Sequence, residues 1–542
     1  MLAASLPFAA IKPLISTPWG ALTDDRALIL IALATWVAVA GWPTERELRA
    51  LGPTLALFAV SVVSAALAPA YADEALKSLW RLLAAGLMFL FALRLAPYQR
   101  TALLWAVLVG AGVSALLGLG EAVSVPGVQS FLSTFKVAPT TVGGHLRVSA
   151  SFQYATIAAM YFEMVAPLAV ALAATTSRRW AAVLATAIAA LCTANVVLSL
   201  TRGGLLTLGL VFGLLLASGW LDRRLRRVWW PTLVSASVLV GGVLWLSARD
   251  PIFGLRLVSE NDADWYGAAY VAPAALDLEP NQTASVAVDV RNEGRIVWSS
   301  AATDHPFALG YRWLTADASG VLDLASGEVA LPHDVAPGET VRLEASVRVP
   351  NLPAGAYRLD WGMVQRDVVQ FYERGWSTAQ TSVTIARAEP GGSLPPVIAR
   401  DDAEAPWVVP RLDLWRAAVH LFAARPVLGV GFDNFRHLYG AELGLDSWDE
   451  RVQANNLYLE VLVDTGILGL AAFAWLVTRP LVDAVRALRG KANYVALGAA
   501  LGVVAFLVHG LLDVFLTFTP TVLLFWLLLA TLMAQKPQVS GR

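Results

Sequence analysis

Residues 79–120 read LWRLLAAGLMFLFALRLAPYQRTALLWAVLVGAGVSALLGLG, and this stretch decides the fold class. It contains two apolar runs, 79–96 and 100–120, and each is long enough to cross about 30 Å of hydrocarbon as a helix. A short loop with Arg94 and Arg100 joins the two runs. Two such runs in direct succession predict a polytopic α-helical membrane protein, for which lipid is the main solvent.

The whole chain has the same character. Hydrophobic residues make up 57% of it and charged residues only 15%, and the mean hydropathy is +0.59. These values lie outside the range of soluble domains. Stretches of sufficient length predict eleven spans, at 26–42, 52–70, 79–96, 100–120, 155–175, 180–200, 203–220, 229–247, 459–478, 493–512 and 518–534.

Residues 3–17 form a candidate twelfth span. Lys12 and Pro13 lie inside this segment, so a re-entrant or interfacial segment is the alternative. We do not interpret it as a removable signal peptide, because it has neither a basic n-region nor a small-residue cleavage site. The sequence therefore predicts eleven or twelve transmembrane helices.

The orientation follows from the positions of arginine and lysine, which are in excess on the cytoplasmic side of a membrane protein. Alternate short loops carry the basic residues Arg46, Arg49, Arg94, Arg100, Arg178, Arg179, Arg223, Arg224, Arg226, Arg227, Arg479, Arg486, Arg489 and Lys491. Lys536 and Arg542 place the C-terminus on that side as well. The insert at 248–458 is then extracytoplasmic. The net charge of −1 gives no indication of a nucleic-acid partner.

The insert changes from helical to period-two hydrophobicity at about residue 270. Val286, Val288 and Val290 alternate with polar or small residues, as do later stretches, and Pro337-Gly338 supplies a turn. Short strands over residues 272–387 predict an all-β, immunoglobulin-like sandwich. Cys192 is the single cysteine and lies in a predicted span, so no intrachain disulfide holds this domain.

The chain thus divides into six segments. They are an N-terminal transmembrane block at 1–247, a linker at 248–271, the extracytoplasmic β-sandwich at 272–387, a segment at 388–458, a C-terminal block of three spans at 459–534 and a cytoplasmic tail at 535–542. The segment 388–458 combines a linker, an amphipathic helix and a catalytic loop. Trp415, Val419 and Phe422 form the apolar stripe of the helix at 411–425, which we expect to lie flat on the outer membrane interface, with Arg411 and Arg416 directed to water or a polar ligand.

Soluble-enzyme signatures are absent from the sequence. Gly429-Val430-Gly431 begins like a dinucleotide fingerprint, but it follows a helix and lacks the third glycine. No Walker loop, His-Glu-x-x-His motif or Cys-x-x-Cys pair occurs, and the six histidines lack metal-ligand spacing. We therefore expect no cofactor and no metal. The remaining partners are membrane lipids and a membrane-bound substrate.

Charged residues at the outer ends of the spans are the best candidates for function, because such residues are costly in lipid. Arg202 lies in the turn Ser199-Leu200-Thr201-Arg202-Gly203-Gly204, where an arginine beside a glycine pair can approach an anion. The alternative is an interfacial arginine that reaches for water. For Arg147 and Glu163 the alternative is a pair with each other, and His509 and Asp513 share a helix face as polar contacts between helices.

Three blocks of the sequence resemble the O-antigen ligase and O-antigen polymerase superfamily of bacterial envelope glycosyltransferases. The first is the Ser199–Gly204 turn. The second runs from Arg411-Leu412-Asp413-Leu414-Trp415 through Arg425–Gly431 to Phe435 and Tyr439. The third comprises Ala454–Glu460 and Thr465–Gly469. The last spans, with Val508-His509-Gly510-Leu511-Leu512-Asp513, are similar as well, whereas the β-sandwich lies outside the resemblance.

The resemblance implies transfer of a glycan from an undecaprenyl-diphosphate carrier to an acceptor hydroxyl, on the outer face of the bacterial cytoplasmic membrane. The acceptor is a glycan, a lipid or a protein. A leaving diphosphate needs fixed positive charge, which arginine supplies through bidentate hydrogen bonds. Arg202 and Arg411 are the expected catalytic arginines, and Arg147 is a third candidate for the diphosphate.

The third block departs from the family pattern. Where much of the family has a histidine, this chain reads Gln453-Ala454-Asn455-Asn456, and neither amide accepts a proton at neutral pH. Glu460, one helical turn after Asn456, is the expected base, with Asn455 orienting the acceptor. The alternative for Glu460 is a structural partner of an arginine. We expect substrate contacts from Arg147, Gln453, Asn456, Tyr458, Arg416 and His437.

Two other function classes remain open. A non-enzymatic glycan or lipid transporter would share the hydropathy, but should show internal repeats or paired broken helices. A membrane-anchored glycan-binding scaffold would leave the Arg202 and Arg411 blocks without a purpose. Within the enzyme class, ligase, polymerase and protein O-oligosaccharyltransferase share these motifs, so the sequence does not select the acceptor.

Overall fold

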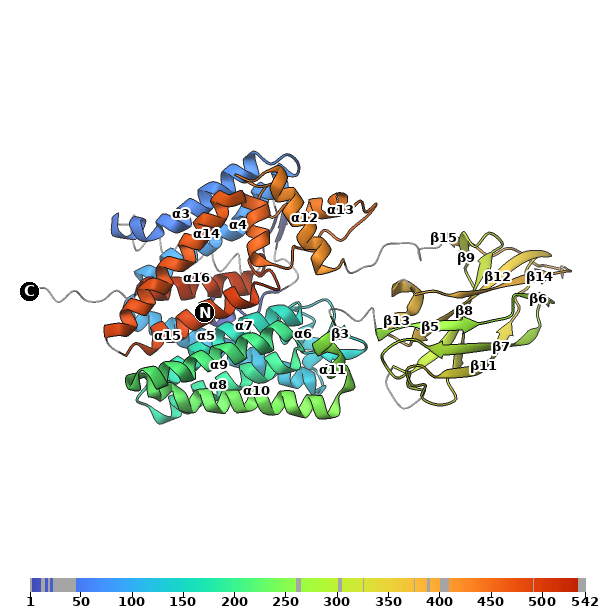
Figure 1. The fold of residues 1–542 in the computed structure, drawn as a ribbon, viewed down its shortest axis with the longest axis horizontal. Coiled ribbons are helices and arrows are strands. Elements are labelled where there is room, and N and C mark those ends of the chain that lie inside the picture. Colours follow the sequence, from blue (N-terminus) through green and yellow to red (C-terminus); the bar gives the residue numbers. More distant parts are fainter. Residues whose placement is uncertain are drawn as a thin grey trace, which may run out of the picture. The chain divides into compact units, whose positions relative to one another are not determined.

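The computed structural model of the protein describes residues 2–10, 15–17, 20–22, 45–259, 265–300, 305–324, 326–374, 376–387, 390–399, 409–490 and 492–534. The chain forms two compact units (Figure 1). A helical unit comprises 1–140, 146–249 and 410–542, and a β unit comprises 141–145 and 250–409.

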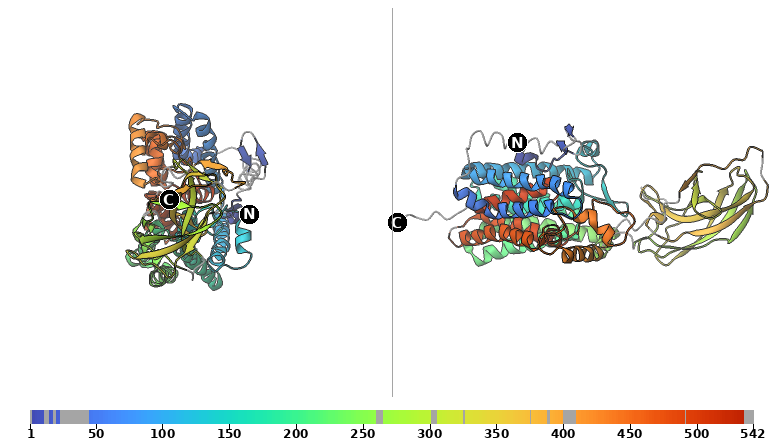
Figure 2. Two further views of the ribbon diagram at one scale, coloured as in Figure 1. Left: turned by 90° about the vertical axis from the view of Figure 1, so that its right-hand side faces the viewer. Right: turned by 90° about the horizontal axis from the view of Figure 1, so that it is seen from above.

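Long apolar helices that run side by side build the helical unit (Figure 2). The helices of the first block are α3 (Glu45–Ala66), α4 (Ala72–Arg94), α5 (Pro97–Ala122), α7 (Ala155–Thr175), α8 (Arg179–Leu198), α9 (Arg202–Leu221) and α10 (Trp229–Arg249). Those of the second block are α14 (Leu457–Gly490), α15 (Tyr494–His509) and α16 (Thr519–Met533). Eight of the described helices are long and apolar enough to cross a membrane, and α15 and α16 are shorter apolar helices. The predicted polytopic helical fold is confirmed.

Most of the predicted spans coincide with one of these helices to within a few residues, apart from α3, which begins earlier, and α14, which extends further at its C-terminal end. The span expected at 26–42 and the tail at 535–542 lie outside the described residues. In the segment 3–17, the described residues form only the four-residue helix α1 (Leu2–Ser5), a turn and the strand β1 (Ile15–Thr17). The part of this segment that the structure describes therefore does not form a transmembrane helix.

Helix α7 occupies the centre of the helical unit. It packs against α8, α9, α15 and α16, and its span is buried along the whole length. Small residues such as Ala158, Ala166 and Ala169 permit these close approaches. A helix buried on all sides is apolar all round, so the one acidic residue of α7, Glu163, is conspicuous.

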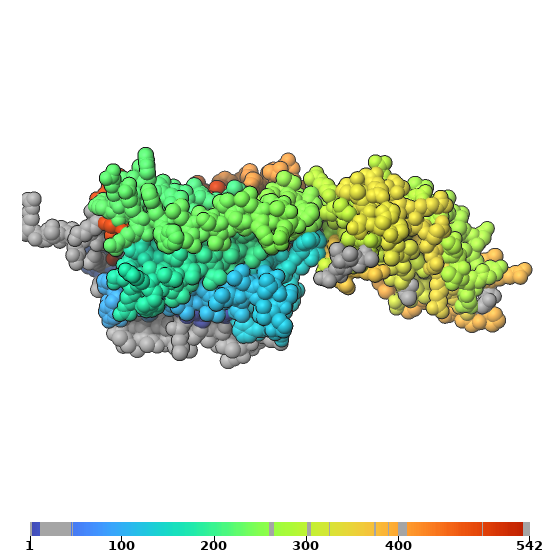
Figure 3. All heavy atoms as spheres, turned by 90° about the horizontal axis from the view of Figure 1, so that it is seen from below, coloured from blue at the N-terminus to red at the C-terminus, as the bar shows by residue number. Residues whose placement is uncertain are grey.

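The surface of the helical unit is apolar, as expected for a surface in contact with lipid. Helix α10 runs along the face seen in Figure 3 and exposes Val240, Leu244 and Trp245. Trp180, Trp220 and Trp230 are exposed where α8 begins, α9 ends and α10 begins. Tryptophan is enriched at membrane interfaces, and these three lie beside the basic loops at 176–178 and 222–228. We refer to this end of the unit as the basic end.

The opposite end carries the connections 123–154, 199–201, 410–456 and 510–518. We refer to it as the site end. Helices α12 (Arg411–Ala424) and α13 (Phe435–Glu442) lie in the longest of these connections. The predicted helix at 411–425 is confirmed, but its buried residues are Leu414, Ala417 and Ala418, and Val419 of the expected stripe is exposed. Its position at the membrane interface stays a prediction.

The β unit contains two sheets. One follows the order β15-β9-β8-β12-β14-β6, with β10 beside β8 and β13 beside β12, and the other the order β11-β7-β5. The central strands are β7 (Thr283–Asn292), β8 (Phe307–Thr315), β11 (Thr340–Arg348), β12 (Gly355–Gln365) and β14 (Ala379–Ile385). Shorter strands are β5 (Ala268–Val271), β6 (Ala275–Leu278), β9 (Gly320–Leu322), β10 (Gly327–Ala330), β13 (Val369–Gln370) and β15 (Val397–Ala399).

A separate β region is therefore confirmed, and its immunoglobulin-like class stays a prediction. Alternate residues are buried along β7 and β11, as the period-two pattern predicted. Buried aromatic residues fill the core, among them Tyr266, Trp298, Phe307 and Phe371, whose rings contact one another. The expected linker at 248–271 contains the helix α11 (Pro251–Val258) and the strand β5, so the β unit begins before residue 272.

Candidate functional site

The Ser199–Gly204 turn joins α8 to α9 at the site end. Leu200 has a φ of 52°, which closes the turn tightly. Arg147 is docked on this turn, because its Nε donates to the carbonyl of Ser199 at 3.0 Å and its Nη2 to Oγ1 of Thr201 at 3.3 Å. Arg202 is the first residue of α9 and is half-buried. The structure thus brings the two predicted residues Arg147 and Arg202 to one turn.

The glycine pair after Arg202 allows two polar side chains to approach the backbone of α9. A Cβ atom on Gly203 would lie 2.6 Å from Nε2 of His509, and one on Gly204 would lie 2.7 Å from Oε1 of Glu163. Both distances are shorter than real contacts of a Cβ atom. Any larger residue at these positions would displace His509 or Glu163, so the glycines serve a packing role that the sequence did not reveal.

His509 and Glu163 begin a chain of four charged or polar side chains, which we call the relay. Nδ1 of His509 lies 3.1 Å from both carboxylate oxygens of Glu163, and both side chains are buried. Nε2 of His509 lies 3.8 Å from Asp513, and Asp513 lies 3.8 Å from Nη2 of Arg411. The relay therefore connects the buried centre of α7 to Arg411 on α12. The pairing of Glu163 with Arg147 is not observed.

A buried ion pair fixes the connection that leads to Arg147. Nζ of Lys136 donates to Glu121 and to Oγ of Ser149, and Oε2 of Glu121 accepts from the backbone N–H groups of Ser149 and Ala150. Burial lowers the pKa of Lys136, and the adjacent Glu121 acts in the opposite direction. The segment before Arg147 is thereby held in one conformation, which places the guanidinium on the Ser199–Gly204 turn.

A break in α14 brings the second and third sequence blocks together. Gly466 has φ 66° and ψ −169°, a conformation essentially restricted to glycine. The segment 426–431 lies against the break. The N–H groups of Val430 and Gly431 donate to the carbonyls of Val463 and Asp464, and the N–H of Ile467 donates to the carbonyl of Pro426. The backbone groups freed by the break thus find partners, as a membrane interior requires.

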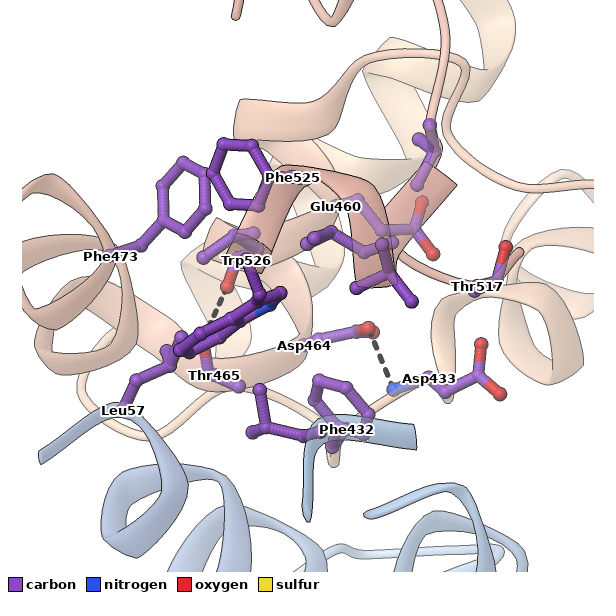
Figure 4. Close-up of a pocket in the computed structure, with 15 residues that line it drawn as sticks. Leu57, Phe432, Asp433, Glu460, Asp464, Thr465, Phe473, Thr517, Phe525 and Trp526 are labelled. Carbon is purple, nitrogen blue, oxygen red and sulfur yellow. Dashed lines mark hydrogen bonds between the residues drawn. The ribbon is translucent and has the colours of Figure 1, made fainter. Parts of the chain in front are cut away.

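A pocket opens beside this break and is lined by three acidic residues, Asp433, Glu460 and Asp464 (Figure 4). Aromatic and aliphatic side chains form the opposite wall, including Phe473, Phe525 and Trp526. We call this the carboxylate pocket. It combines polar groups on one side with an apolar wall on the other, an arrangement typical of a binding site.

The three carboxylates differ in their partners. Asp464 accepts hydrogen bonds from the backbone N–H groups of Asp433 and Phe435, and so shapes the turn before α13. Asp433 lies 3.0 Å from Nη1 of Arg81 and 3.3 Å from Nε of Arg436, and Ser78 donates to it as well. Asp464 and Asp433 therefore have structural roles, because their hydrogen bonds and ion pairs fix the surrounding segments.

Glu460 has fewer partners. One carboxylate oxygen, Oε2, accepts from the backbone N–H of Ala454 at 2.7 Å, and the other, Oε1, is buried with no hydrogen-bond partner among the described residues. Its charged neighbours are Asp464, Asp433 and Arg436. Glu460 is therefore a buried carboxylate with a free oxygen in a pocket, which is the geometry that a base needs. It does not pair with Arg202 or Arg411 through any contact that we observe.

The residues between Gln453 and Tyr458 connect the relay to the carboxylate pocket. Asn456 caps α14, because its Oδ1 accepts from the N–H groups of Tyr458 and Leu459. Its Nδ2 donates to the carbonyl of Leu511, and the hydroxyl of Tyr458 donates to the carbonyl of Leu507. These contacts fix the start of α14 against the end of α15. Asn456 and Tyr458 thus have structural roles in addition to the predicted substrate contact.

Gln453, Asn455, His437 and Arg416 lie around this connection. Oε1 of Gln453 accepts from Thr517, a residue of the carboxylate pocket, at 3.4 Å. Asn455 is half-buried and has a φ of 48°. His437 stacks on Tyr71 and lies 3.2 Å from the carboxylate of Glu450. Arg416 is largely exposed and pairs with Asp413, so it is the most peripheral of the predicted residues.

Several residues of this end were not recognisable from the sequence. The sequence predicts polar contacts between helices for His509 and Asp513, but not their connection to Glu163 and Arg411. Asp433, Asp464 and Arg81 were not recognised. The available signal was the placement of acidic residues next to the glycines of the second and third blocks, at Asp433 and Asp464. Among the described residues, no group of three or more His, Cys, Asp or Glu side chains is placed to hold a metal ion.

The fold and the site define a polytopic helical membrane protein with an arginine-rich polar centre at one end. A comparison with protein families identifies the class: residues 367–474 match the family described as O-antigen ligase. The match covers the second and third sequence blocks, so the predicted resemblance to the O-antigen ligase superfamily is confirmed for this part of the chain. The Ser199–Gly204 turn lies outside the matched residues.

The other comparisons add no functional information. No curated protein matches the chain. Among solved structures, one similar chain is that of the Pseudomonas fluorescens alkylpurine DNA glycosylase AlkC bound to DNA containing an abasic site analog. The identity is 9%, the coverage is 63% of this chain and 99% of that chain, and the TM-score is 0.15. A likeness at this level carries no argument about fold or function.

Proposed function

We propose that this protein is a glycosyltransferase that moves a glycan from an undecaprenyl-diphosphate carrier to an acceptor hydroxyl at the outer face of the bacterial cytoplasmic membrane. One observation carries the proposal. Arg411, the Ser199–Gly204 glycines and His509 come from distant parts of the chain, and the relay connects them at the site end. The first and second sequence blocks thus contribute to one polar centre.

The arginines bind the diphosphate in this proposal. Arg411 and Arg202 hold the phosphate oxygens, and Arg147 adds a third guanidinium at the same turn. A guanidinium keeps its proton at any physiological pH and donates two parallel hydrogen bonds. As the bond between the anomeric carbon and the diphosphate oxygen breaks, negative charge grows on the leaving group. Fixed donors stabilise this charge without reorganisation, and one donor contributes a few kcal/mol.

The relay positions Arg411 for this task. Glu163 holds the ring of His509, His509 faces Asp513, and Asp513 attracts the guanidinium. Glu163 and His509 are buried, whereas Arg411 and Asp513 are partly exposed. The relay thus has buried side chains at one end and, at the other end, a partly exposed guanidinium that can reach the substrate. His509, Glu163 and Asp513 are positioning residues in this scheme.

Glu460 acts as the base. The acceptor hydroxyl attacks the anomeric carbon on the side opposite to the diphosphate, so the configuration inverts, and the hydroxyl proton passes to the free Oε1 of Glu460. Asn455 orients the acceptor. The remaining predicted contacts, which are those of Gln453, Asn456, Tyr458, His437 and Arg416, are assigned to binding of the substrates. Departure of the diphosphate supplies most of the driving force, so a weak base is sufficient.

Two assays test the proposal. In cells, deletion of the gene should cause a lipid-linked glycan to accumulate and one envelope polymer to disappear. In vitro, the full-length protein in lipid nanodiscs should release undecaprenyl diphosphate from that lipid-linked glycan when acceptor is added. If the deletion changes neither the glycan pool nor the envelope polymers, the proposal is wrong. The nature of the lost polymer also identifies the enzyme as a ligase, a polymerase or a protein O-oligosaccharyltransferase.

The transporter alternative has one observation in its favour, which is the broken helix α14. Discontinuous helices line the substrate sites of many transporters, where they normally occur in pairs related by an internal repeat. Among the described transmembrane helices, α14 alone is interrupted by a residue of non-helical conformation, Gly466. A transporter would move the intact lipid-linked glycan across the bilayer of a liposome without releasing undecaprenyl diphosphate.

A further inference from the structure

The larger sheet of the β unit has a groove on the face that points away from the core. In β8 and β12, Trp313 and Trp361 are buried in the core, and the residues next to them along each strand point to the opposite face. The register pairs Gly310 with Gly362 and Arg312 with Asp360 across these two strands. All four residues line the groove, which has a volume of about 190 Å³.

Two features hollow out this face. Gly310 and Gly362 lack side chains, and they lie opposite each other on neighbouring strands, so the centre of the sheet is bare. The walls come from Ser326, Gly327 and Glu328 on one side and from Gln370 and Tyr372 on the other. The groove is partly open to solvent. It accommodates one sugar ring of a chain that continues into solvent.

The floor of the groove contains a buried ion pair. Nε and Nη2 of Arg312 donate to Oδ2 of Asp360 at 2.9 and 2.8 Å, and the exposed fractions of the side chains are 15% and 1%. The guanidinium carbon lies 3.8 Å from the centre of the Tyr372 ring. A buried pair of this kind contributes little net stability, because desolvation offsets the attraction. Arg312 and Asp360 instead place fixed polar groups on the floor of the groove, where a ligand would meet them.

The charges and polar groups of the groove favour an uncharged ligand that is rich in hydroxyl groups. Arg312 and Asp360 neutralise each other, and Glu328 pairs with Arg366. An anionic ligand would meet the carboxylates of both Asp360 and Glu328. A sugar hydroxyl both donates and accepts, as do the amide of Gln370 and the hydroxyl of Ser326. Tyr372 adds an aromatic ring at the edge, a rigid side chain with an apolar face and a polar tip.

We propose that this groove is a saccharide-binding site, and that it holds a neutral segment of the glycan on which the helical unit acts. The identity of the ligand as that glycan rests on the proposed function, whereas binding of a saccharide by the groove does not. The β unit then serves to retain a substrate or product chain near the enzyme. It raises the local concentration of that chain without taking part in the chemical step.

Binding can be measured apart from transfer. The probe is a set of oligosaccharide fragments prepared from the surface polysaccharide of the source organism, and the protein is the full chain in nanodiscs, studied by calorimetry. The Gly362→Val variant fills the floor of the groove. A Cβ atom at this position would meet only ordinary contacts, with the closest atom, Cγ2 of Thr378, at 3.5 Å, so the strand should tolerate it. Gly355→Val, in the same strand but outside the groove, is the matched control.

We expect wild type to bind a fragment, Gly362→Val and Tyr372→Ala to weaken binding by about tenfold or more, and Gly355→Val to bind like wild type within about twofold. The site does not exist if wild type binds no fragment, or if Gly362→Val binds as well as wild type. The two proposals fail separately. Fragment binding without release of undecaprenyl diphosphate would refute the proposed glycosyltransferase activity and support the saccharide site. Normal release without fragment binding would support the activity and refute the saccharide site.

Discussion

At the scale of single residues, Arg411 shows how a charge can be held ready at the end of a helix bundle. Its partner Asp513 lies on the turn after α15, and His509, one helical turn before Asp513, reaches into the bundle to Glu163. The guanidinium is therefore restrained from behind by a carboxylate that is itself fixed by buried groups. In the proposed reaction such preorganisation would favour catalysis, because no reorganisation is needed when charge develops on the leaving group.

Arg411→Lys and Arg202→Ala should each reduce release of undecaprenyl diphosphate by about 10²-fold or more, since both remove guanidinium donors from the leaving group. Lysine keeps the charge at position 411 but loses the two parallel hydrogen bonds. Arg451→Lys is the matched control, because Arg451 is exposed and pairs with Asp449 on the surface. Wild-type turnover of Arg411→Lys, at an equal amount of folded protein, would show that Arg411 is structural.

Glu460→Gln should lower transfer from purified lipid-linked donor by about 10²-fold, because the amide keeps the shape of the side chain and cannot accept the proton. Glutamine also keeps an acceptor for the N–H of Ala454, so the fold of the connection should persist. Glu442→Gln serves as control, since Glu442 contacts only His420 at the surface among the contacts we observe. Near-normal activity of Glu460→Gln would show that Glu460 is not the base, and Asn455 would remain only as a group that orients the acceptor.

The sequence predicted the residues that carry a motif and missed those that act through packing. Arg202, Arg411 and Glu460 were recognisable because a charge stands at the end of a span or beside a glycine. The pairing of His509 with Glu163 joins residues 346 positions apart. Hydropathy predicts that two helices exist, but not that α15 packs on α7, and this packing decides the partner of a buried histidine.

At the scale of elements, the break in α14 is the feature that shapes the site end. A Cβ atom on Gly466 would lie 2.2 Å from the carbonyl oxygen of Val427, so the segment 426–431 can approach only a glycine. Gly429, on the approaching segment, must also lack a side chain. Its φ is 74°, and a Cβ atom there would lie 2.5 Å from the backbone of Asp464. The two glycines therefore allow these segments of the second and third sequence blocks to pack in direct contact.

Gly466→Ala should destabilise the protein, because alanine in this conformation costs about 1–3 kcal/mol and adds a clash with Val427. We expect a lower midpoint of thermal unfolding in detergent and a reduced yield of folded protein. Gly213→Ala in α9 is the control, since a Cβ atom there meets no atom within 4 Å. Equal thermal stability of the two variants would mean that the break is not strained.

The sequence predicted the positions of the helices well and the break in α14 not at all. A span is recognisable because about 20 apolar residues in succession suffice to cross the bilayer. Glycine is common in such spans, and although Asp464 and Thr465 precede Gly466, one acidic residue in an apolar run does not by itself indicate a break. The break depends on a segment some 40 residues earlier, and this partner cannot be read from the local pattern.

At the scale of the whole molecule, the division into a helical and a β unit was predictable because the hydrophobic period changes from helical to two at about residue 270. The exact limits of the two units were not predictable. Residues 141–145 belong with the β unit, and β5 and β15 lie outside the range 272–387. A three-residue strand carries too little pattern to be recognised, and it forms because a sheet edge offers backbone partners. The groove on β8 and β12 was likewise invisible, since it depends on which glycines face each other.

The topology prediction places the loops at 94–100, 177–179 and 221–228 in the cytoplasm and the insert at 248–458 outside. Cysteine labelling can test it, and the structure guides the choice of sites. Gly320, in the middle of the insert, is unsuitable, because it is buried in β9 and a Cβ atom there would lie 2.3 Å from Val397. Ala336 is exposed next to the Pro337-Gly338 turn, and Ser177 is exposed in the loop between α7 and α8.

In a Cys192→Ala background, an impermeant maleimide should therefore label Ala336→Cys in intact cells, after permeabilisation of the outer membrane where the organism has one. Ser177→Cys should react only after the cytoplasmic membrane is opened, because positively charged loops stay on the inner side. The native Cys192 is buried and should not react in either condition. Protection of Ala336→Cys in intact cells together with labelling of Ser177→Cys would invert the topology. The proposed site would then face the cytoplasm, and transfer to an acceptor outside would be excluded.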